Sequence, residues 1–200
     1  MLVWINGPFG GGKTVTAFEL ARRCAGAVVC DPEEVGFGLR RAMPKEVWGE
    51  DFQDLRAWRV GVLEVLDRTL RGHEGPVLVP MTLVEPAYVD EVIGGLRGLG
   101  HEVRHVALVS SSEEVRRRLA RRGIPGVKRD LWALAQVDRC LEALTQPGFA
   151  EQVDTTHRSV AEVADAVADL VGLPIAPSND GPVLGWFRRT RTSLRHIRLS

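Results

Sequence analysis

A glycine-rich segment near the start of the chain constrains the fold more than any other feature of the sequence. It matches the pattern G-x-x-x-x-G-K-S/T, and its residues are Gly7, Pro8, Phe9, Gly10, Gly11, Gly12, Lys13 and Thr14. The apolar run Leu2–Asn6 precedes the segment, and apolar residues at helical spacing follow it. A strand, a glycine loop and a helix in this order form a phosphate-binding loop, whose backbone N–H groups converge on phosphate oxygens. The sequence therefore predicts that a nucleoside triphosphate, ATP or GTP, binds to a parallel α/β fold.

Two side chains of this loop have expected roles of their own. The Lys13 ammonium reaches the β and γ phosphates, and the Thr14 hydroxyl ligates Mg²⁺. The alternative is a glycine-rich turn that binds nothing. The chain has only three lysines against 23 arginines, so a lysine at the required position favours the phosphate-binding interpretation.

Apolar runs and helical patterns alternate along the rest of the chain. We expect five strands, at Leu2–Asn6, Ala27–Cys30, Val77–Pro80, Val103–Val109 and Gln152–Asp154, of which the last has the weakest pattern. Strand–helix alternation produces right-handed crossovers, so it predicts a five-stranded parallel sheet with helices on both faces. We expect this domain to span residues 1–172, followed by a proline-containing linker at 173–182 and a basic amphipathic tail at 183–200.

Charge and cysteine content limit the possible partners. The chain has 26 basic and 26 acidic residues, which argues against a nucleic-acid-binding surface over the whole molecule. Five arginines and no acidic residue lie within 181–200, so the tail can lie on an anionic membrane or dock on the acidic remainder of the chain. Three scattered cysteines and no apolar stretch of about 18 residues indicate a cytoplasmic protein without structural metal, at most peripheral on the inner face of the cell membrane.

An acidic residue at the end of the second expected strand is the candidate catalytic base. The third strand ends without a carboxylate, whereas Asp31 directly follows the second. Ligands of doubly wound sheets lie at the carboxyl ends of the strands. Asp31 can therefore accept the proton of a substrate hydroxyl or hold Mg²⁺ through water. The alternative is that Asp31 stabilises only the N-terminus of the next helix.

A run of arginines is a candidate for the lid segment that P-loop enzymes close over the transferring phosphoryl group. Five arginines lie within seven residues: Arg116, Arg117, Arg118, Arg121 and Arg122. Arg118 and Arg122 share a helix face, and a glycine-containing break follows, so we expect a lid at about 116–129. Arg139 on the following helix can return to the phosphates or the adenine. A solvated basic face is the alternative.

Residues between the second and third strands are candidates for contacts with the phosphoryl acceptor. Trp58, together with Trp48, Phe52 and Arg59, can line a pocket for a flat, polar substrate or belong to the core, and the sequence leaves both open. Glu34, Arg40 and Met81 complete the set of candidate substrate residues.

Several sequence blocks occur in an order that resembles the tunicamycin-resistance ATP-binding protein family. They are Trp4-Ile5-Asn6-Gly7, Thr16-Ala17-Phe18-Glu19-Leu20, Asp31-Pro32-Glu33, Gly36-Phe37, Leu39-Arg40, Val79-Pro80-Met81-Thr82, Gln136-Val137-Asp138-Arg139-Cys140 and His196-Ile197-Arg198. The resemblance implies a bacterial P-loop protein, similar in fold to shikimate and chloramphenicol kinases, that protects against nucleoside antibiotics. It implies ATP and Mg²⁺ at Lys13 and Thr14, a base at Asp31, and lid roles for Arg118, Arg122 and Arg139. Gly11 departs from the serine or valine that is commoner in the family.

These observations favour an ATP-dependent O-phosphotransferase that inactivates a nucleoside antibiotic by phosphorylating a sugar hydroxyl. Two alternatives remain. One is a protein that uses ATP to bind and sequester the drug without turnover, and the other is a nucleoside or metabolite kinase. Asp31 favours an enzyme over a sequestering protein, and the family resemblance favours a drug over a metabolite.

Overall fold

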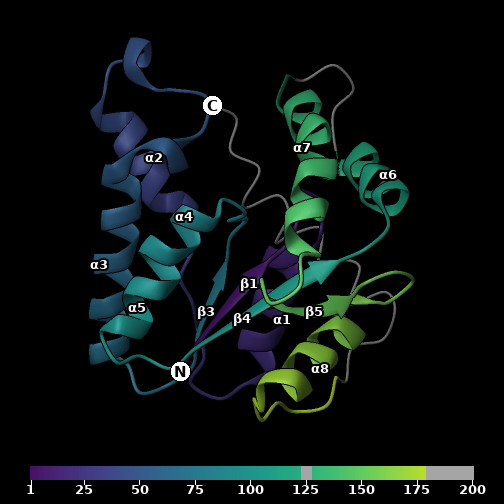
Figure 1. Ribbon diagram of the computed structural model, residues 1–200. Helices are drawn as coiled ribbons and strands as arrows, with labels where there is room; N and C mark the ends of the chain where they lie inside the picture. Colours follow the sequence, from purple (N-terminus) through teal and green to yellow (C-terminus); the bar gives the residue numbers. More distant parts are fainter. Residues whose placement is uncertain (123–127, 179–200) are drawn as a thin grey trace.

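The central element of the computed structural model is a five-stranded parallel sheet (Figure 1). The structure describes residues 1–122 and 128–178. The strands are β1 (Leu2–Asn6), β2 (Val28–Val29), β3 (Val77–Pro80), β4 (Val103–Val109) and β5 (Glu151–Asp154), in the order β2-β3-β1-β4-β5. The predicted parallel sheet is confirmed, with β1, β3 and β4 at the expected residues. The second strand is shorter than the predicted Ala27–Cys30.

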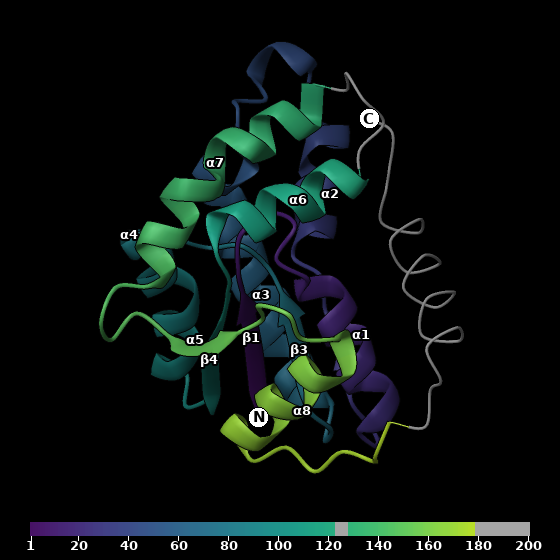
Figure 2. The same ribbon diagram turned by 90° about the vertical axis from the view of Figure 1, so that its right-hand side faces the viewer.

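Helices cover both faces of the sheet and the ends of its strands (Figures 1 and 2). Their bounds are α1 (Lys13–Arg23), α2 (Glu33–Ala42), η1 (Lys45–Val47), η2 (Phe52–Asp54), α3 (Arg56–Gly72), α4 (Pro86–Val89), η3 (Asp90–Gly94), α5 (Gly95–Gly98), α6 (Ser112–Arg122), α7 (Lys128–Leu144) and α8 (Val160–Val171). Helices α1 and α8 pack on one face, and α3 with α4–α5 packs on the other. Helices α2, α6 and α7 lie beyond the carboxyl ends of the strands, where the phosphate-binding loop also lies.

The side chains of β1 alternate between the two halves of the core. Val3 and Ile5 belong to the cluster beneath α1 and α8, whereas Leu2 and Trp4 belong to the cluster beneath α3 and α5, and all four are fully buried. A strand that is apolar on both faces belongs in the middle of a covered parallel sheet. The uninterrupted apolar run at the start of the sequence therefore folds as the central strand, and it delivers the glycine-rich loop to the middle of the strand ends.

Local residues define both ends of the last helix, α8. Ser159 and Glu162 form a reciprocal capping box before α8, and Gly172 ends the helix with a φ of 69°. Glycine adopts this left-handed conformation without the strain that a Cβ would cause. The helical segment that begins at Pro86 is divided into α4, α5 and the intervening π-turn η3.

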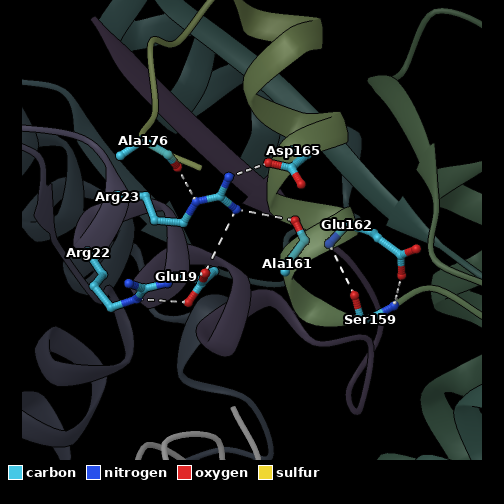
Figure 3. A network of polar contacts seen from close by, with 8 residues as sticks. All are labelled: Glu19, Arg22, Arg23, Ser159, Ala161, Glu162, Asp165 and Ala176. Atoms are coloured by element: carbon cyan, nitrogen blue, oxygen red, sulfur yellow. Dashed lines mark hydrogen bonds and ion pairs between the residues drawn. The ribbon is translucent and has the colours of Figure 1, made fainter. Parts of the chain in front are cut away.

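Arg23 joins the helix after the phosphate-binding loop to the last helix (Figure 3). Its guanidinium donates to the backbone oxygens of Ala176, at 2.6 Å, and Ala161, at 3.4 Å. It also forms ion pairs with Asp165 of α8 and, at 3.8 Å, with Glu19 of α1. The Arg23 side chain is only 3% exposed. A single buried guanidinium therefore holds together α1, α8 and the segment that follows α8.

We expect Arg23→Met to lower the free energy of unfolding by about 2–3 kcal/mol, because two carbonyls lose a donor and the ion pair with Asp165 is lost. Arg22→Met is the matched control. The ion pair of Arg22 with Glu19 joins residues one helical turn apart, and the Arg22 side chain is more exposed than that of Arg23. Ion pairs of this kind contribute less than about 1 kcal/mol. Urea unfolding monitored by circular dichroism measures both variants. Equal losses in the two variants would show that the buried network adds no special stability.

Two parts of the sequence-based interpretation lie outside the described residues. One is the glycine-containing break of the expected lid, residues 123–127, and the other is the chain from 179 onward, which includes the basic tail 183–200 and part of the linker. The domain limits and the membrane contact therefore stay predictions. None of the helices in the described part of the chain is both long and apolar enough to cross a bilayer.

Candidate functional site

The phosphate-binding loop connects the central strand β1 to the first turn of α1. Gly10 and Gly12 have φ values of 79° and 93°, a region that side chains with a Cβ avoid. A Cβ on Gly10 would also lie 2.8 Å from Cγ of Leu119 on α6, so the loop and α6 are in close contact. No side chain caps the N-terminus of α1. The backbone N–H groups at such a helix N-terminus are suited to donate to a phosphate oxygen.

The ammonium of Lys13 lies over this loop. Its Nζ donates a hydrogen bond to the Pro8 carbonyl at 3.0 Å and is 5.5 Å from the centroid of the Phe9 ring. Thr14 follows Lys13 in the first turn of α1. The structure therefore places the two residues with expected roles in phosphate and metal binding together at the start of the helix.

A buried polar cluster beneath the loop is a feature that the sequence analysis did not identify. Asn6 Oδ1 accepts hydrogen bonds from the backbone N–H groups of Gly7 and Leu83, and its Nδ2 donates to Leu83 O at 2.6 Å and contacts His105 Nε2 at 3.0 Å. The Thr82 hydroxyl donates to Gly7 O at 2.8 Å. Burial lowers the pKa of His105 to about 4, so its imidazole is neutral near pH 7 and can accept from Asn6. The cluster fixes the start of the loop to the segment after β3.

Asp31 lies between β2 and α2, as expected from the sequence. Its Oδ1 accepts a hydrogen bond from the backbone N–H of Glu33 at 3.0 Å. The contact that the capping alternative requires is therefore present. A carboxylate has several acceptor positions, so this contact is compatible with a second role for Asp31, which stays a prediction.

A cavity of about 430 Å³ adjoins the phosphate-binding loop. It is lined by Phe9 of the loop, by Glu33, Phe37 and Arg40 of α2, by Glu50, Asp51, Phe52 and Gln53, by Met81 after β3, and by Trp132 and Ala133 of α7. A half-enclosed cavity that combines aromatic side chains with placed polar groups is a usual form of a small-molecule site. Its position beside the loop suits a molecule that accepts a phosphoryl group.

Two of the four candidate substrate residues line this cavity, and two do not. Arg40 and Met81 line it, whereas Trp58 is fully buried in the core and donates its indole N–H to Pro32 O at 3.0 Å. The pocket-lining alternative for Trp58 is therefore wrong: it packs behind Phe52, with ring centroids 5.6 Å apart. Glu34 is not among the lining residues, and its neighbour Glu33 is.

Two edge-to-face aromatic pairs contribute to the cavity wall. Phe37 and Phe52 have ring centroids 6.2 Å apart at an interplanar angle of 70°. Phe9 and Trp132 have centroids 4.9 Å apart at 68°. Such pairs are favourable beyond the area that they bury, and they hold the four rings at fixed orientations. Trp132 belongs to no sequence motif, and the Gly36-Phe37 block implies no role for Phe37, so only the folded chain identifies the two as lining residues.

The polar groups of the cavity are held by contacts of their own. Asp51 Oδ1 accepts from the backbone N–H of Gln53 at 3.0 Å, and burial raises the pKa of the Asp51 carboxyl above its ordinary value. The Arg40 guanidinium lies 5.4 Å from the ring centroids of both Trp48 and Phe52 and donates to Glu50 O at 3.1 Å. Arg40 is therefore largely engaged by the wall of the cavity.

The arginines of α6 form bonds to neighbouring elements. Arg118 donates to the Thr155 hydroxyl at 3.0 Å and to Thr155 O at 2.8 Å, and it pairs with Glu114. Arg116 pairs with Asp138 of α7 at 2.7 Å. The basic run is thus not a purely solvated face. Its role as a lid stays a prediction, and the side chain of Arg122 lies outside what the structure describes.

Arg139 is the remaining arginine with an expected role. It is 64% exposed on α7 and lies 3.9 Å from Glu85. It also contributes to the electrostatic environment of Asp51. Arg139 and Trp132 of the cavity lie on the same helix, α7, and the role of Arg139 in a lid stays a prediction.

The residues after β1 and after β2 have donor types that fit a magnesium ion arriving with a nucleotide. Mg²⁺ prefers hydroxyl, carboxylate and phosphate oxygens, and Thr14 and Asp31 supply the first two kinds. Within residues 1–122 and 128–178 there is no group of three or more His, Cys, Asp or Glu side chains that could hold a metal ion without other ligands.

Comparisons with known proteins agree with this architecture. The AAA domain family matches residues 2–147. No curated protein sequence matches the chain. A sugar kinase from Janibacter has a TM-score of 0.64 at 17% identity, over 86% of this chain and 94% of that chain. The Mycobacterium tuberculosis APS kinase, solved with AMPPNP and APS, has a TM-score of 0.57 at 19% identity, over 86% and 96%. These two show that the fold is that of P-loop kinases.

A more similar structure identifies the family. The tunicamycin resistance protein of Deinococcus radiodurans is 31% identical, with a TM-score of 0.74, over 88% of this chain and 99% of that chain. The match thus extends over most of this chain and nearly all of the other. This chain has the fold of P-loop kinases and therefore belongs, with the Deinococcus protein, to the tunicamycin-resistance protein family.

Proposed function

We propose that this protein transfers the γ-phosphoryl group of ATP to a sugar hydroxyl of a nucleoside antibiotic of the tunicamycin type, and so inactivates it. The observation that carries the proposal is the cavity of about 430 Å³, which shares Phe9 with the phosphate-binding loop. An acceptor in this cavity lies next to a triphosphate on the loop. Proximity of this kind is most of what phosphoryl transfer requires from a protein.

The described residues supply the expected functions of a kinase site. Lys13 and the N–H groups at the start of α1 neutralise the phosphate oxygens, and Thr14 with Asp31 would hold Mg²⁺. The oxygen of the attacking sugar hydroxyl bonds to the γ-phosphorus while the bond from the γ-phosphorus to ADP breaks. Asp31 accepts the proton that this hydroxyl loses. Arg118, Arg122 and Arg139 are the candidates that stabilise charge on the transferring group, and for Arg118 this requires exchange of its bonds to Thr155 for bonds to phosphate.

A second function, sequestration of the drug without turnover, has one observation in its favour. The third strand ends in Val79-Pro80-Met81-Thr82, with no carboxylate to assist the metal. The Thr82 hydroxyl at this position is bonded to Gly7 O. In this case ATP would order the loop and α6 around a bound drug.

The proposal includes a cytoplasmic location, where Mg²⁺ and ATP are available. The three cysteines Cys24, Cys30 and Cys140 are free thiols, as a reducing compartment favours. A GTP-dependent reaction has the same site requirements, so the nucleotide is part of the test.

Mass spectrometry of the drug distinguishes the two functions. We expect tunicamycin that has been incubated with the protein, Mg²⁺ and ATP to gain about 80 Da, the mass of one phosphoryl group in place of a hydrogen. Parallel incubations contain GTP, no nucleotide, or the Lys13→Ala variant, and we expect the last two to leave the drug unchanged. Unchanged drug in the complete reaction, together with tight ATP-dependent binding, would establish sequestration and overturn the proposed transfer.

A further inference from the structure

We infer that the cavity beside the phosphate-binding loop selects an uncharged, hydroxyl-bearing ring and rejects acceptors that carry a phosphate or carboxylate group, with Asp51 as the residue that sets this preference. The inference rests on the proposed function in one respect, that the cavity holds the phosphoryl acceptor. It adds the charge class of the acceptor and a specificity-determining residue.

The walls of the cavity are suited to a flat or ring-shaped molecule. One aromatic pair, Phe37 with Phe52, belongs to α2 and η2, and the other, Phe9 with Trp132, belongs to the loop and α7. Helices α2 and α7 stand on different sides of the strand ends (Figure 1). Aromatic rings bind the apolar faces of sugars and bases without requiring any charge on the ligand.

The charged groups of the cavity disfavour an anion. Three carboxylates line it, those of Glu33, Glu50 and Asp51, and Arg40 is the single cationic side chain among the described lining residues. Arg40 is already held against two aromatic rings and Glu50 O. A phosphate or carboxylate on the acceptor would therefore face a net negative wall in a partly desolvated site, where like charges repel more strongly than in water.

Of the two neighbouring carboxylates Glu50 and Asp51, that of Asp51 is less hydrated, so a hydroxyl-bearing ligand stabilises it more. Asp51 is half-buried, whereas Glu50 is exposed, and the raised pKa of the Asp51 carboxyl reflects lost hydration. Its capping contact with Gln53 uses Oδ1. Hydroxyl groups of a sugar are donors that restore the lost hydrogen bonds to a carboxylate, and charge-assisted bonds of this kind are stronger than neutral ones.

Pairs of probes that differ only in charge test the inference. The pairs are uridine with uridine 5′-monophosphate and N-acetylglucosamine with its 6-phosphate. Binding to the full-length protein is measured by isothermal titration calorimetry with Mg²⁺ and saturating AMPPNP, which keeps the monophosphates off the phosphate-binding loop. We expect the uncharged member of at least one pair to bind about tenfold or more tightly than its phosphorylated partner.

Asp51→Asn removes the charge but keeps an oxygen that can cap η2. We expect it to reduce the preference to within about threefold, mainly through tighter binding of the phosphorylated member. Glu50→Gln should act in the same direction and more weakly, because Glu50 is exposed. Glu46→Gln is the matched control: it removes a carboxylate from an exposed position of η1 outside the cavity, and we expect the wild-type preference.

Three results would overturn the inference: equal or tighter binding of the phosphorylated members to the wild type, no binding of any probe, or a preference that Asp51→Asn leaves unchanged. Its failure is distinguishable from failure of the proposed reaction. A preference that depends on Asp51, with no phosphorylation of tunicamycin, removes only the reaction. Phosphorylation of tunicamycin without such a preference removes only the inference.

Discussion

Replacing Asp31 with asparagine should lower the rate of phosphoryl transfer by roughly 10²–10⁴, the usual contribution of a general base, while nucleotide affinity stays nearly unchanged. Asparagine keeps a side-chain oxygen that can accept from Glu33 N–H, so it preserves the contact that the structure shows at the start of α2. It removes the charge that takes the proton. The comparison therefore separates the chemical role of Asp31 from its capping role.

Asp31→Ala completes this experiment. If Asp31 is the base, both variants lose turnover, and alanine also loses about 1 kcal/mol of stability with the capping contact. If Asp31 only caps α2, asparagine retains wild-type turnover and alanine lowers the unfolding midpoint with little effect on kcat. Steady-state kinetics and thermal unfolding on the same protein samples decide between the two outcomes. Wild-type turnover by Asp31→Asn would exclude general-base catalysis at this residue.

The strands were predictable where local sequence alone determines burial. Leu2–Asn6, Val77–Pro80 and Val103–Val109 are mostly apolar, and each of these strands pairs with a neighbour on both sides. The second strand was predicted too long, because it is an edge strand that pairs only with β3 and its two valines are only partly buried. Edge position depends on the order of strands in the sheet, and no local pattern in the sequence encodes that order.

The sequence contained a signal that Trp58 lies in the core and not in the pocket. Trp58, Val62 and Leu66 are spaced by four residues, and all three are buried on one face of α3. A large aromatic residue in line with two aliphatic ones belongs to the core stripe of an amphipathic helix. The signal for a core position was therefore present in the sequence, and the pocket alternative had no comparable periodic support.

The cavity was predictable from the sequence only in part: Arg40, Phe52 and Met81 were candidates for substrate contact and do line it, whereas Phe37 and Trp132 were not candidates. Its lining comes from the loop after β1, from α2, from the residues around η2 and from α7, so Phe9 and Trp132 are more than 120 positions apart and yet pack ring against ring. The same holds for Arg118, whose partner Thr155 follows β5. These contacts depend on how the helices pack beyond the strand ends, and residue types in the sequence do not specify such packing.

Lys13→Ala should lower phosphoryl transfer by roughly 10²–10³, or ~3–4 kcal/mol, because one charge-assisted contact with the transferring group is lost. The fold should remain, since the contact that Lys13 makes with Pro8 O joins two residues of the same loop and a hydrogen bond of this kind contributes about 1 kcal/mol. Cells that express the variant at wild-type levels should lose resistance to the drug. Turnover of purified protein and the unfolding midpoint provide the two measurements in vitro.

Lys45→Ala is the control for this substitution, because Lys45 is an exposed lysine of η1. Its ammonium lies over the Trp48 ring at 5.9 Å, so the variant loses a lysine and a cation–π contact but no group beside the phosphates. We expect its turnover to stay within about twofold of the wild type, as for most surface substitutions. Since both variants lose one positive charge, a rate loss confined to Lys13→Ala assigns the effect to position on the loop. Equal losses in the two variants would instead assign the rate loss to the overall charge of the protein. Resistance retained by cells that express Lys13→Ala would remove ATP from the mechanism.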